Sequence, residues 1–106
     1  MDSIQGYDVK YELNGQLFIW NSEKAKTNII KHKITFEEAA TLFVDDRTEY
    51  FKDKENSDYE ERYIAIGLSD KFNILMVCHC VRENDTVTRI ISARRADKHE
   101  QKRFRR

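Results

Sequence analysis

The chain of 106 residues contains no proline, three glycines and two cysteines. Without proline it holds no proline-rich linker, and so few glycines exclude a collagen-like repeat. No apolar run approaches the roughly 18 residues of a transmembrane helix, and no secretory signal of a charged start and an apolar segment is present. We therefore expect a cytoplasmic protein with reduced cysteines.

Apolar residues make up 40% of the chain, charged residues 36%, and the mean hydropathy is −0.78. Six phenylalanines and five tyrosines argue against disorder, because aromatic side chains bury large areas. The length fits one domain. We expect a single domain over residues 1–106, in which residues 1–16 are an extension of uncertain structure, either a strand or a loosely held arm.

The formal net charge is zero, but charges of opposite sign are separated along the chain. Residues 45–61 carry eight acids and three bases, whereas residues 94–106 carry seven bases and two acids. Residues 21–33 add four lysines against one glutamate. This separation predicts a polyanion on the basic side and, on the acidic side, a basic partner or the chain's own tail. The alternative is a solvated surface with pairing inside the chain.

A strand and two helices are expected in the first half. Residues 17–20 form an apolar run of strand length. Asn21 or Ser22 can cap the helix that follows. Thr35 and Glu38 form a capping box at the start of a second helix. The apolar residues of that helix recur at helical spacing: Phe36, Ala39, Ala40 and Phe43.

Four strands and a short helix are expected in the second half. The strands are 48–51, 62–68, 72–82 and 86–93, and the helix is 97–104. Connections of hairpin length make the later strands antiparallel. The predicted order is β-α-α-β-β-β-β-α. The fold class is α+β, an antiparallel sheet with the two N-terminal helices packed on one face and a short C-terminal helix.

Cys78-His79-Cys80 is the one run that suggests a metal site. In an extended strand, however, the two cysteines point to one face and His79 to the other, so the three cannot chelate one zinc ion. Small buried hydrophobic residues are the better interpretation of the cysteines. Glycine-rich phosphate loops, nucleophile elbows and dinucleotide-binding motifs are absent, and we expect no cofactor.

Basic and imidazole side chains remain as candidates for chemistry. Four fall on the later strands, where they can converge on one exposed face: Arg62, His79, Arg89 and Arg94. Arginines bind phosphate oxygens bidentately, and a histidine can move the proton of a 2′-OH or a leaving oxygen. The alternative for His79 is a hydrogen-bonded core imidazole. The alternative for His32, at a helix end, is a cation that caps the last carbonyls.

Three strings of residues stand out when the chain is read as a whole. The first runs from Phe18-Ile19-Trp20-Asn21 through Lys24, Asn28 and Lys31-His32 to Thr35-Phe36-Glu37-Glu38-Ala39 and Phe43. The second is Glu61-Arg62 with Gly67 and the apolar strand through His79. The third is Arg89-Ile90-Ile91-Ser92-Ala93-Arg94 with Glu100. Together, over residues 18–104, these strings resemble the BrnT family of small bacterial toxins.

The resemblance implies a RelE-like fold and a ribonuclease activity that arrests translation. It also implies neutralisation by a BrnA-type antitoxin with a ribbon-helix-helix region, the complex repressing its own operon. Three departures stand out. Lys33 replaces the family's usual glycine after the Lys-His pair, so that helix is expected to end differently. Phe104 replaces a common tyrosine, and residues 1–16 extend beyond the usual start.

We therefore expect the toxin of a type II toxin–antitoxin system, a metal-independent endoribonuclease with the 2′-OH of RNA as nucleophile. His79, with His32 as second choice, is the candidate general acid or base, and Arg62 and Arg94 would hold the scissile phosphate. The candidate RNA-binding residues are Lys31, Arg89, Arg95 and Lys98.

The antitoxin is expected to bind the C-terminal helix through Lys98, Lys102 and Arg103, because opposite potentials speed encounter and fix orientation. Ribbon-helix-helix regions dimerise, so the complex should hold at least two copies of this chain, with operator DNA contacted only through the antitoxin. The alternative function is a non-enzymatic nucleic-acid-binding or corepressor module that acts through a partner.

Overall fold

The computed structural model describes residues 5–57 and 59–105. Its first half holds strands β1 (Asp8–Leu13) and β2 (Gln16–Asn21), helices α1 (Ser22–His32) and α2 (Phe36–Ala40), and the short 3-10 helix η1 (Thr41–Val44). Its second half holds β3 (Glu49–Lys52), the 3-10 helix η2 (Lys54–Asn56), β4 (Tyr63–Leu68), β5 (Ile74–Arg82), β6 (Val87–Arg95) and α3 (Lys98–Arg105). None of the helices described is long and apolar enough to cross a membrane.

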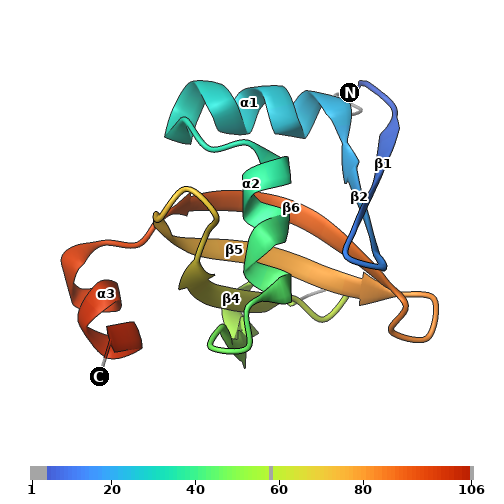
Figure 1. The fold of residues 1–106 in the computed structure, drawn as a ribbon. Helices are drawn as coiled ribbons and strands as arrows, with labels where there is room; N and C mark the ends of the chain where they lie inside the picture. The colour runs from blue at the N-terminus through green and yellow to red at the C-terminus, as the bar shows by residue number, and fades with distance from the viewer. Residues whose placement is uncertain (1–4, 58, 106) are drawn as a thin grey trace.

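The six strands form one sheet in the order β1-β2-β6-β5-β4-β3 (Figure 1). Strands β3 to β6 pair antiparallel with their neighbours, as their short connections predict. The expectation of an antiparallel sheet fails at one place, because β2 pairs parallel with β6, with Leu17 opposite Val87. The chain leaves β2 through two helices and returns to its side only with the last strand, so no hairpin constrains that pair.

The segment left open between a strand and a loose arm forms a hairpin. β1 pairs with β2 along its whole length. Asn14 and Gly15 make the turn with φ angles of 53° and 81°, the positive pair that a type I′ turn requires. An Asn-Gly pair is itself a hairpin signal, so this strand was predictable. Residues 1–4 of the segment lie outside the described residues.

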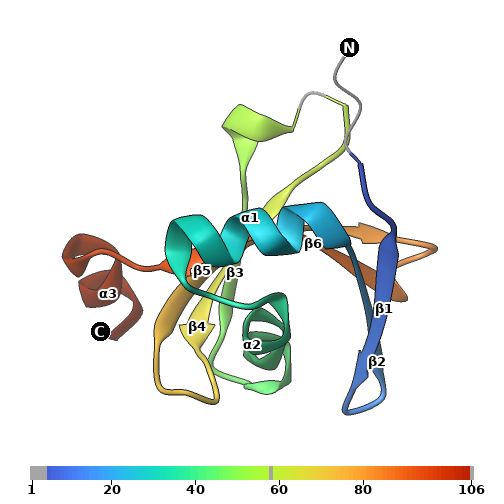
Figure 2. The same ribbon diagram turned by 90° about the horizontal axis from the view of Figure 1, so that it is seen from above.

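Helix α1 does not share a sheet face with α2. It runs along the edge of β6 beyond the last paired residue of β2, while α2 lies across the sheet (Figures 1 and 2). The buried side chain of Asn28 accepts a hydrogen bond from the Ala93 amide at 3.0 Å and donates to the Ala93 carbonyl at 2.8 Å. It also donates to the Ile34 carbonyl at 3.0 Å. The Asn28 side chain thus pairs with the backbone of β6 at a place where a neighbouring strand is absent.

The ends of α1 follow from its sequence. The Asn21 side chain accepts hydrogen bonds from the amides of Glu23 and Lys24, which are orphan donors of the first turn. Lys33 ends the helix with a φ of 62°, and its amide bonds to the Ile29 carbonyl. Lys33 thus adopts the left-handed conformation that glycine usually takes at a helix end. This costs on the order of 1 kcal/mol, because a side chain disfavours the left-handed conformation.

Only half of the predicted capping box forms at α2. The Thr35 hydroxyl accepts from the Glu38 amide at 3.0 Å. The Glu38 carboxylate does not return to Thr35; instead it accepts from the Ser69 hydroxyl at 2.6 Å and the Asn73 amide at 2.8 Å. This buried carboxylate therefore ties α2 to the turn between β4 and β5, which explains why it leaves the cap.

The core lies between α2 with η1 and one face of the sheet. We call this the covered face; Ala65 and Val77 point into it. The opposite face, with Ile64, Cys78 and Ser92, we call the outer face. These assignments follow from the strand register, in which directly paired residues share a face. The fully buried side chains of the core cluster include Phe18, Ile34, Phe36, Leu42, Leu75, Val77 and Ile90.

Helix α3 lies at one end of the sheet (Figure 1). Its half-buried Phe104, the residue that replaces the family's common tyrosine, lines a hollow with Phe51 and Met76 on the outer face. The aromatic ring is thus used for packing at this position.

Replacement of Asn28 by alanine is expected to lower the free energy of unfolding by about 2–3 kcal/mol, because it leaves the buried amide and carbonyl of Ala93 unpaired. Thr27→Ala, an exposed neighbour on the same helix, is the matched control. Urea unfolding of both variants measures the difference. Equal losses in the two variants would show that α1 is held by burial alone.

Candidate active site

The arginines predicted on the later strands lie on the outer face. Arg89 pairs with Cys80, and Arg94 pairs with Met76. Arg62 precedes Tyr63, which faces the covered side opposite His79. The electrostatics agree with this placement: burial raises the pKa of the Cys78 thiol, and the positive charges of Arg62 and Lys24 oppose that rise. Arg62, Arg89 and Arg94 therefore share one face, as expected.

Helix α1 adds a basic wall beside this face. A hollow between α1 and β6 is lined by Lys24, Lys31 and His32 together with Ser92. Ser92 pairs with Cys78 and so belongs to the outer face. The helix brings these side chains there because it follows the edge of β6. His32, the second choice for proton transfer, is half-buried at this wall.

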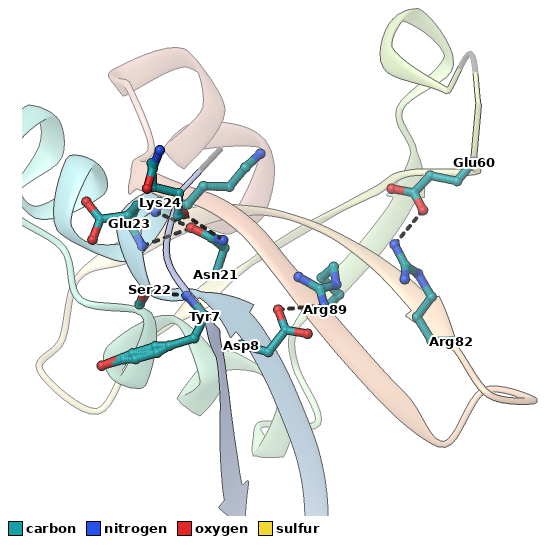
Figure 3. A network of polar contacts seen from close by, with 10 residues as sticks. Tyr7, Asp8, Asn21, Ser22, Glu23, Lys24, Glu60, Arg82 and Arg89 are labelled. Atoms are coloured by element: carbon teal, nitrogen blue, oxygen red, sulfur yellow. Dashed lines mark hydrogen bonds and ion pairs between the residues drawn. The ribbon is translucent and has the colours of Figure 1, made fainter. Parts of the chain in front are cut away.

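Arg89 is held at the centre of the outer face by a carboxylate from β1. Its guanidinium donates to Asp8 at 3.2 Å, and Figure 3 shows the pair between the two strands. Its Nε is fully buried and has no hydrogen-bond partner in the described part of the chain. Burying a donor without a partner costs free energy, so the fold holds Arg89 in a position that stability alone does not favour.

Arg94 already carries a bidentate partner. Both of its terminal nitrogens donate to the Glu100 carboxylate at 2.9 Å. The hydrogen bonds from Arg94 lower the pKa of Glu100 to about 2. Glu100 also closes a capping box with Asp97 at the start of α3. The fork that was expected to hold a phosphate is thus filled by a carboxylate of the same chain.

His79 does not join the arginines. It lies on the covered face and is 3% exposed. Its Nδ1 lies 3.2 Å from the Val77 carbonyl, and burial lowers its pKa. The expectation that it converges with Arg62 and Arg94 in one open cleft is therefore wrong, because alternation along β5 turns it to the other side. The alternative interpretation, a hydrogen-bonded core imidazole, describes this residue.

The same alternation places the two cysteines. Cys78 and Cys80 are free thiols on the outer side of β5, with His79 between them on the covered side. Burial raises the pKa of both thiols. Among the described residues, no group of three or more His, Cys, Asp or Glu is arranged to hold a metal ion.

The remaining basic candidates are dispersed. Arg95 pairs with Leu75 and so turns away from the outer face; it donates to the His32 carbonyl at 3.3 Å and closes the end of α1. Three candidates on α3 are exposed: Lys98, Lys102 and Arg103. Of the four residues expected to bind RNA, Lys31 and Arg89 lie at the outer face, whereas Arg95 and Lys98 lie outside it.

Lys24 lines the hollow beside the outer face but was not among the sequence candidates. It precedes Lys31 by seven positions and Asn28 by four, which places all three on one side of a helix. That spacing was a usable signal. The spacing alone, however, does not show that this side of the helix lies beside the arginines of the sheet. That follows only from the position of α1 along β6.

Comparisons of the chain with known proteins lead to one family. The model of the family described as the ribonuclease toxin BrnT of type II toxin–antitoxin systems matches residues 20–100. The 1.1 Å crystal structure of the Brucella abortus ribonuclease toxin BrnT is similar, with a TM-score of 0.58 and 25% identity. That similarity covers 74% of this chain and 94% of the Brucella chain. No curated protein matches the chain.

Glu100→Gln is expected to lower stability in a manner that depends on pH. The folded pKa of about 2 lies below the ordinary 4.5, so the carboxylate stabilises the fold above pH 4.5 and loses this effect as the pH falls toward 2. The loss above pH 5 should be about 1 kcal/mol, because solvent screens a partly exposed pair. Thermal unfolding from pH 2 to 7, with the exposed Glu12→Gln as control, measures it. A difference that does not shrink at low pH would contradict the assignment.

Proposed function

Since the chain belongs to the BrnT family of ribonuclease toxins of type II toxin–antitoxin systems, we propose that it cleaves RNA on its outer face without a metal ion. Cleavage of RNA would inhibit translation. The observation that carries this proposal is the gathering of cations from strand β6, the loop before β4 and helix α1 on one side of the sheet. The residues are Lys24, Arg62, Arg89 and Arg94.

The arginines would hold the scissile phosphate. Arg62 lies close enough to Cys78 for its charge to act on the thiol, and Arg89 reaches the same side of β5. A guanidinium binds two phosphate oxygens at once and stabilises the charge that develops on them. Both terminal nitrogens of Arg94 are taken by Glu100, whereas only one of Arg89 donates to Asp8. Arg62 and Arg89 would therefore form the phosphate site, and Arg94 would join it only when Glu100 is displaced.

His32 is the better candidate for proton transfer. In the proposed step, a base takes the proton of the 2′-OH, its oxygen attacks the phosphorus, and the 5′-oxygen leaves with a proton from an acid. The products are a cyclic phosphate and a 5′-OH. His32 lines the hollow beside Ser92, on the side of the phosphate site. His79, buried on the other face, is no longer proposed for this role.

Three further properties belong to the same proposal. Metal independence is supported by the Cys-His-Cys run, which is divided between the two faces of β5 and cannot chelate one ion. A RelE-like architecture is supported by a sheet with its helix α2 on one face and its basic groups on the other. A cytoplasmic location is supported by a substrate that occurs there.

Incubation of the free protein with RNA in excess EDTA is expected to give cleavage with cyclic-phosphate ends. Arg62→Ala and His32→Ala should each lower the rate by about 100-fold or more, as for lost phosphate and proton-transfer groups. His79→Gln, if it remains folded by circular dichroism, should stay within about tenfold of the parent because it removes no group from the site.

The outcome separates two functions. Loss of cleavage in EDTA, or products with a 3′-OH, would reject the metal-independent mechanism. If toxicity in cells follows RNA affinity in all variants and no variant loses cleavage alone, the protein is a binding or corepressor module, for which the shared basic face would suffice. Loss of cleavage by His32→Ala with RNA affinity retained identifies an enzyme.

Membership in a type II family implies an antitoxin partner. We propose that this partner is BrnA-like, with a ribbon-helix-helix region that contacts operator DNA, and that the complex contains two copies of this chain. Acidic and apolar residues of the antitoxin would bind α3. Support comes from the exposed bases on that helix: Lys98, Lys102 and Arg103.

The triple variant Lys98→Glu, Lys102→Glu and Arg103→Glu is expected to bind the antitoxin at least about tenfold more weakly at low salt, where exposed charges act most strongly. The difference should narrow as salt is added. Lys10→Glu, exposed on β1, is the control. Affinity is measured by calorimetry, and an unchanged value at low salt would place the antitoxin elsewhere.

A further inference from the structure

A second concave site lies at the ends of β4 and β5, mainly on the covered side, and Cys80 and Arg82 also line it. It is an open hollow of about 570 Å³. Its lining combines three aromatic rings with His79 and three carboxylates, and neither the phosphate site nor the α3 surface uses it. The residues are Phe43, Tyr50, Tyr63, His79, Glu60, Glu61 and Asp85.

Three aromatic rings lie close to the imidazole. Phe43 meets His79 edge to face at 4.9 Å between ring centroids, and Tyr50 does so at 6.0 Å. Tyr63 lies tilted at 6.1 Å. Tyr50 is 50% exposed, so part of its ring is available to a ligand. Aromatic walls around a polar centre are a common way to hold a cation.

His79 presents a hydrogen-bond acceptor to this hollow. Its lowered pKa favours the neutral ring, and Nδ1 carries the proton when it donates to the Val77 carbonyl. The second ring nitrogen, Nε2, then holds a lone pair. Among the described residues, Nε2 has no hydrogen-bond partner. It is not fully buried, so a ligand can reach it. His79 is 3% exposed, and a buried acceptor without a partner favours the binding of a donor.

Carboxylates add negative charge at the rim. Glu61 accepts a hydrogen bond from the Tyr63 hydroxyl at 3.0 Å and pairs with Lys52 at 3.3 Å. Both members of the Lys52 pair are exposed, so the pair contributes little and can open. Glu60 pairs with Arg82. With three carboxylates against one arginine in the lining, the hollow repels a phosphate and attracts a cation.

We propose that this hollow binds an arginine side chain of the antitoxin. Arginine fits better than lysine, because a planar guanidinium stacks on a ring while its N–H groups reach both an imidazole nitrogen and a carboxylate. The proposal rests on family membership, which implies the partner, and not on the ribonuclease mechanism. It also gives a role to the acidic segment 45–61, whose charge predicts a basic partner.

The chain's own basic tail is a poorer occupant. Phe104 of α3 packs by Phe51 and Met76, and none of the described residues of α3 lines the hollow. The cation must therefore come from another molecule. A second copy of this chain is the competing source, and it is distinguished by its effect on oligomeric state.

The test is an NMR titration of the folded chain with acetyl-arginine-amide and with acetyl-citrulline-amide, which has nearly the same shape without the charge. Saturable shifts of the His79 and Tyr63 ring signals are expected with the arginine probe alone. Glu61→Gln and Tyr50→Leu should each weaken binding by at least about threefold. Glu37→Gln, exposed on α2, should leave binding unchanged.

A second measurement connects the hollow to the partner. Glu61→Lys should weaken binding of the co-expressed antitoxin by about tenfold or more, as expected for a like charge at an interface, while the rate of RNA cleavage by the free protein stays unchanged. Equal shifts with the citrulline probe, stronger shifts with adenosine monophosphate, or unchanged antitoxin affinity would each overturn the proposal. So would an oligomer of the chain alone that Glu61→Lys dissociates.

Discussion

The position of α1 depends on one buried amide, and the candidate active site depends on the position of α1. The hydrogen bonds of Asn28 join the helix to the backbone of Ala93 where β2 has left the sheet. They satisfy polar groups that would otherwise be buried unpaired on a central strand. Because the helix is held at this edge, Lys24 and His32 line the same hollow as Ser92 of the outer face. A helix packed across the covered face would have left the arginines without this wall.

Alternation along β5 then divides the chemistry between two sides. Cys78 faces Arg62 and Lys24, while His79 faces the core and the aromatic hollow. The register between β5 and β6 shifts by one residue between Cys78 and His79, and Ile91 of β6 therefore has no partner on β5. Ile90 therefore returns to the covered side and fills the core beside His79. In the two proposals made above, one strand thus contributes to an RNA surface and to a cation site of opposite electrostatic character.

Most elements were predictable because their signals are local. The caps at Asn21 and Thr35 and the hairpin connections act over a few residues, and the structure has them. The parallel pairing of β2 with β6 and the place of α1 depend on residues far apart in the sequence, which no local pattern reports. For His79, alternation alone separates it from the cysteines. Which face of β5 is exposed, however, depends on where α2 packs. The sequence therefore could not show whether His79 shares an open face with Arg62.

The separation of charge in the sequence acquires a physical meaning in the fold. The chain has no net charge, yet it offers a basic face for a polyanion and an acidic hollow for a cation. The basic face is in turn connected to α3, because Glu100 on that helix fills the fork of Arg94 on β6. A carboxylate and a phosphate compete for the same guanidinium geometry. On the proposed function, a partner that moves α3 would therefore change how many arginines the outer face offers to RNA, without contacting Arg62 or Arg89.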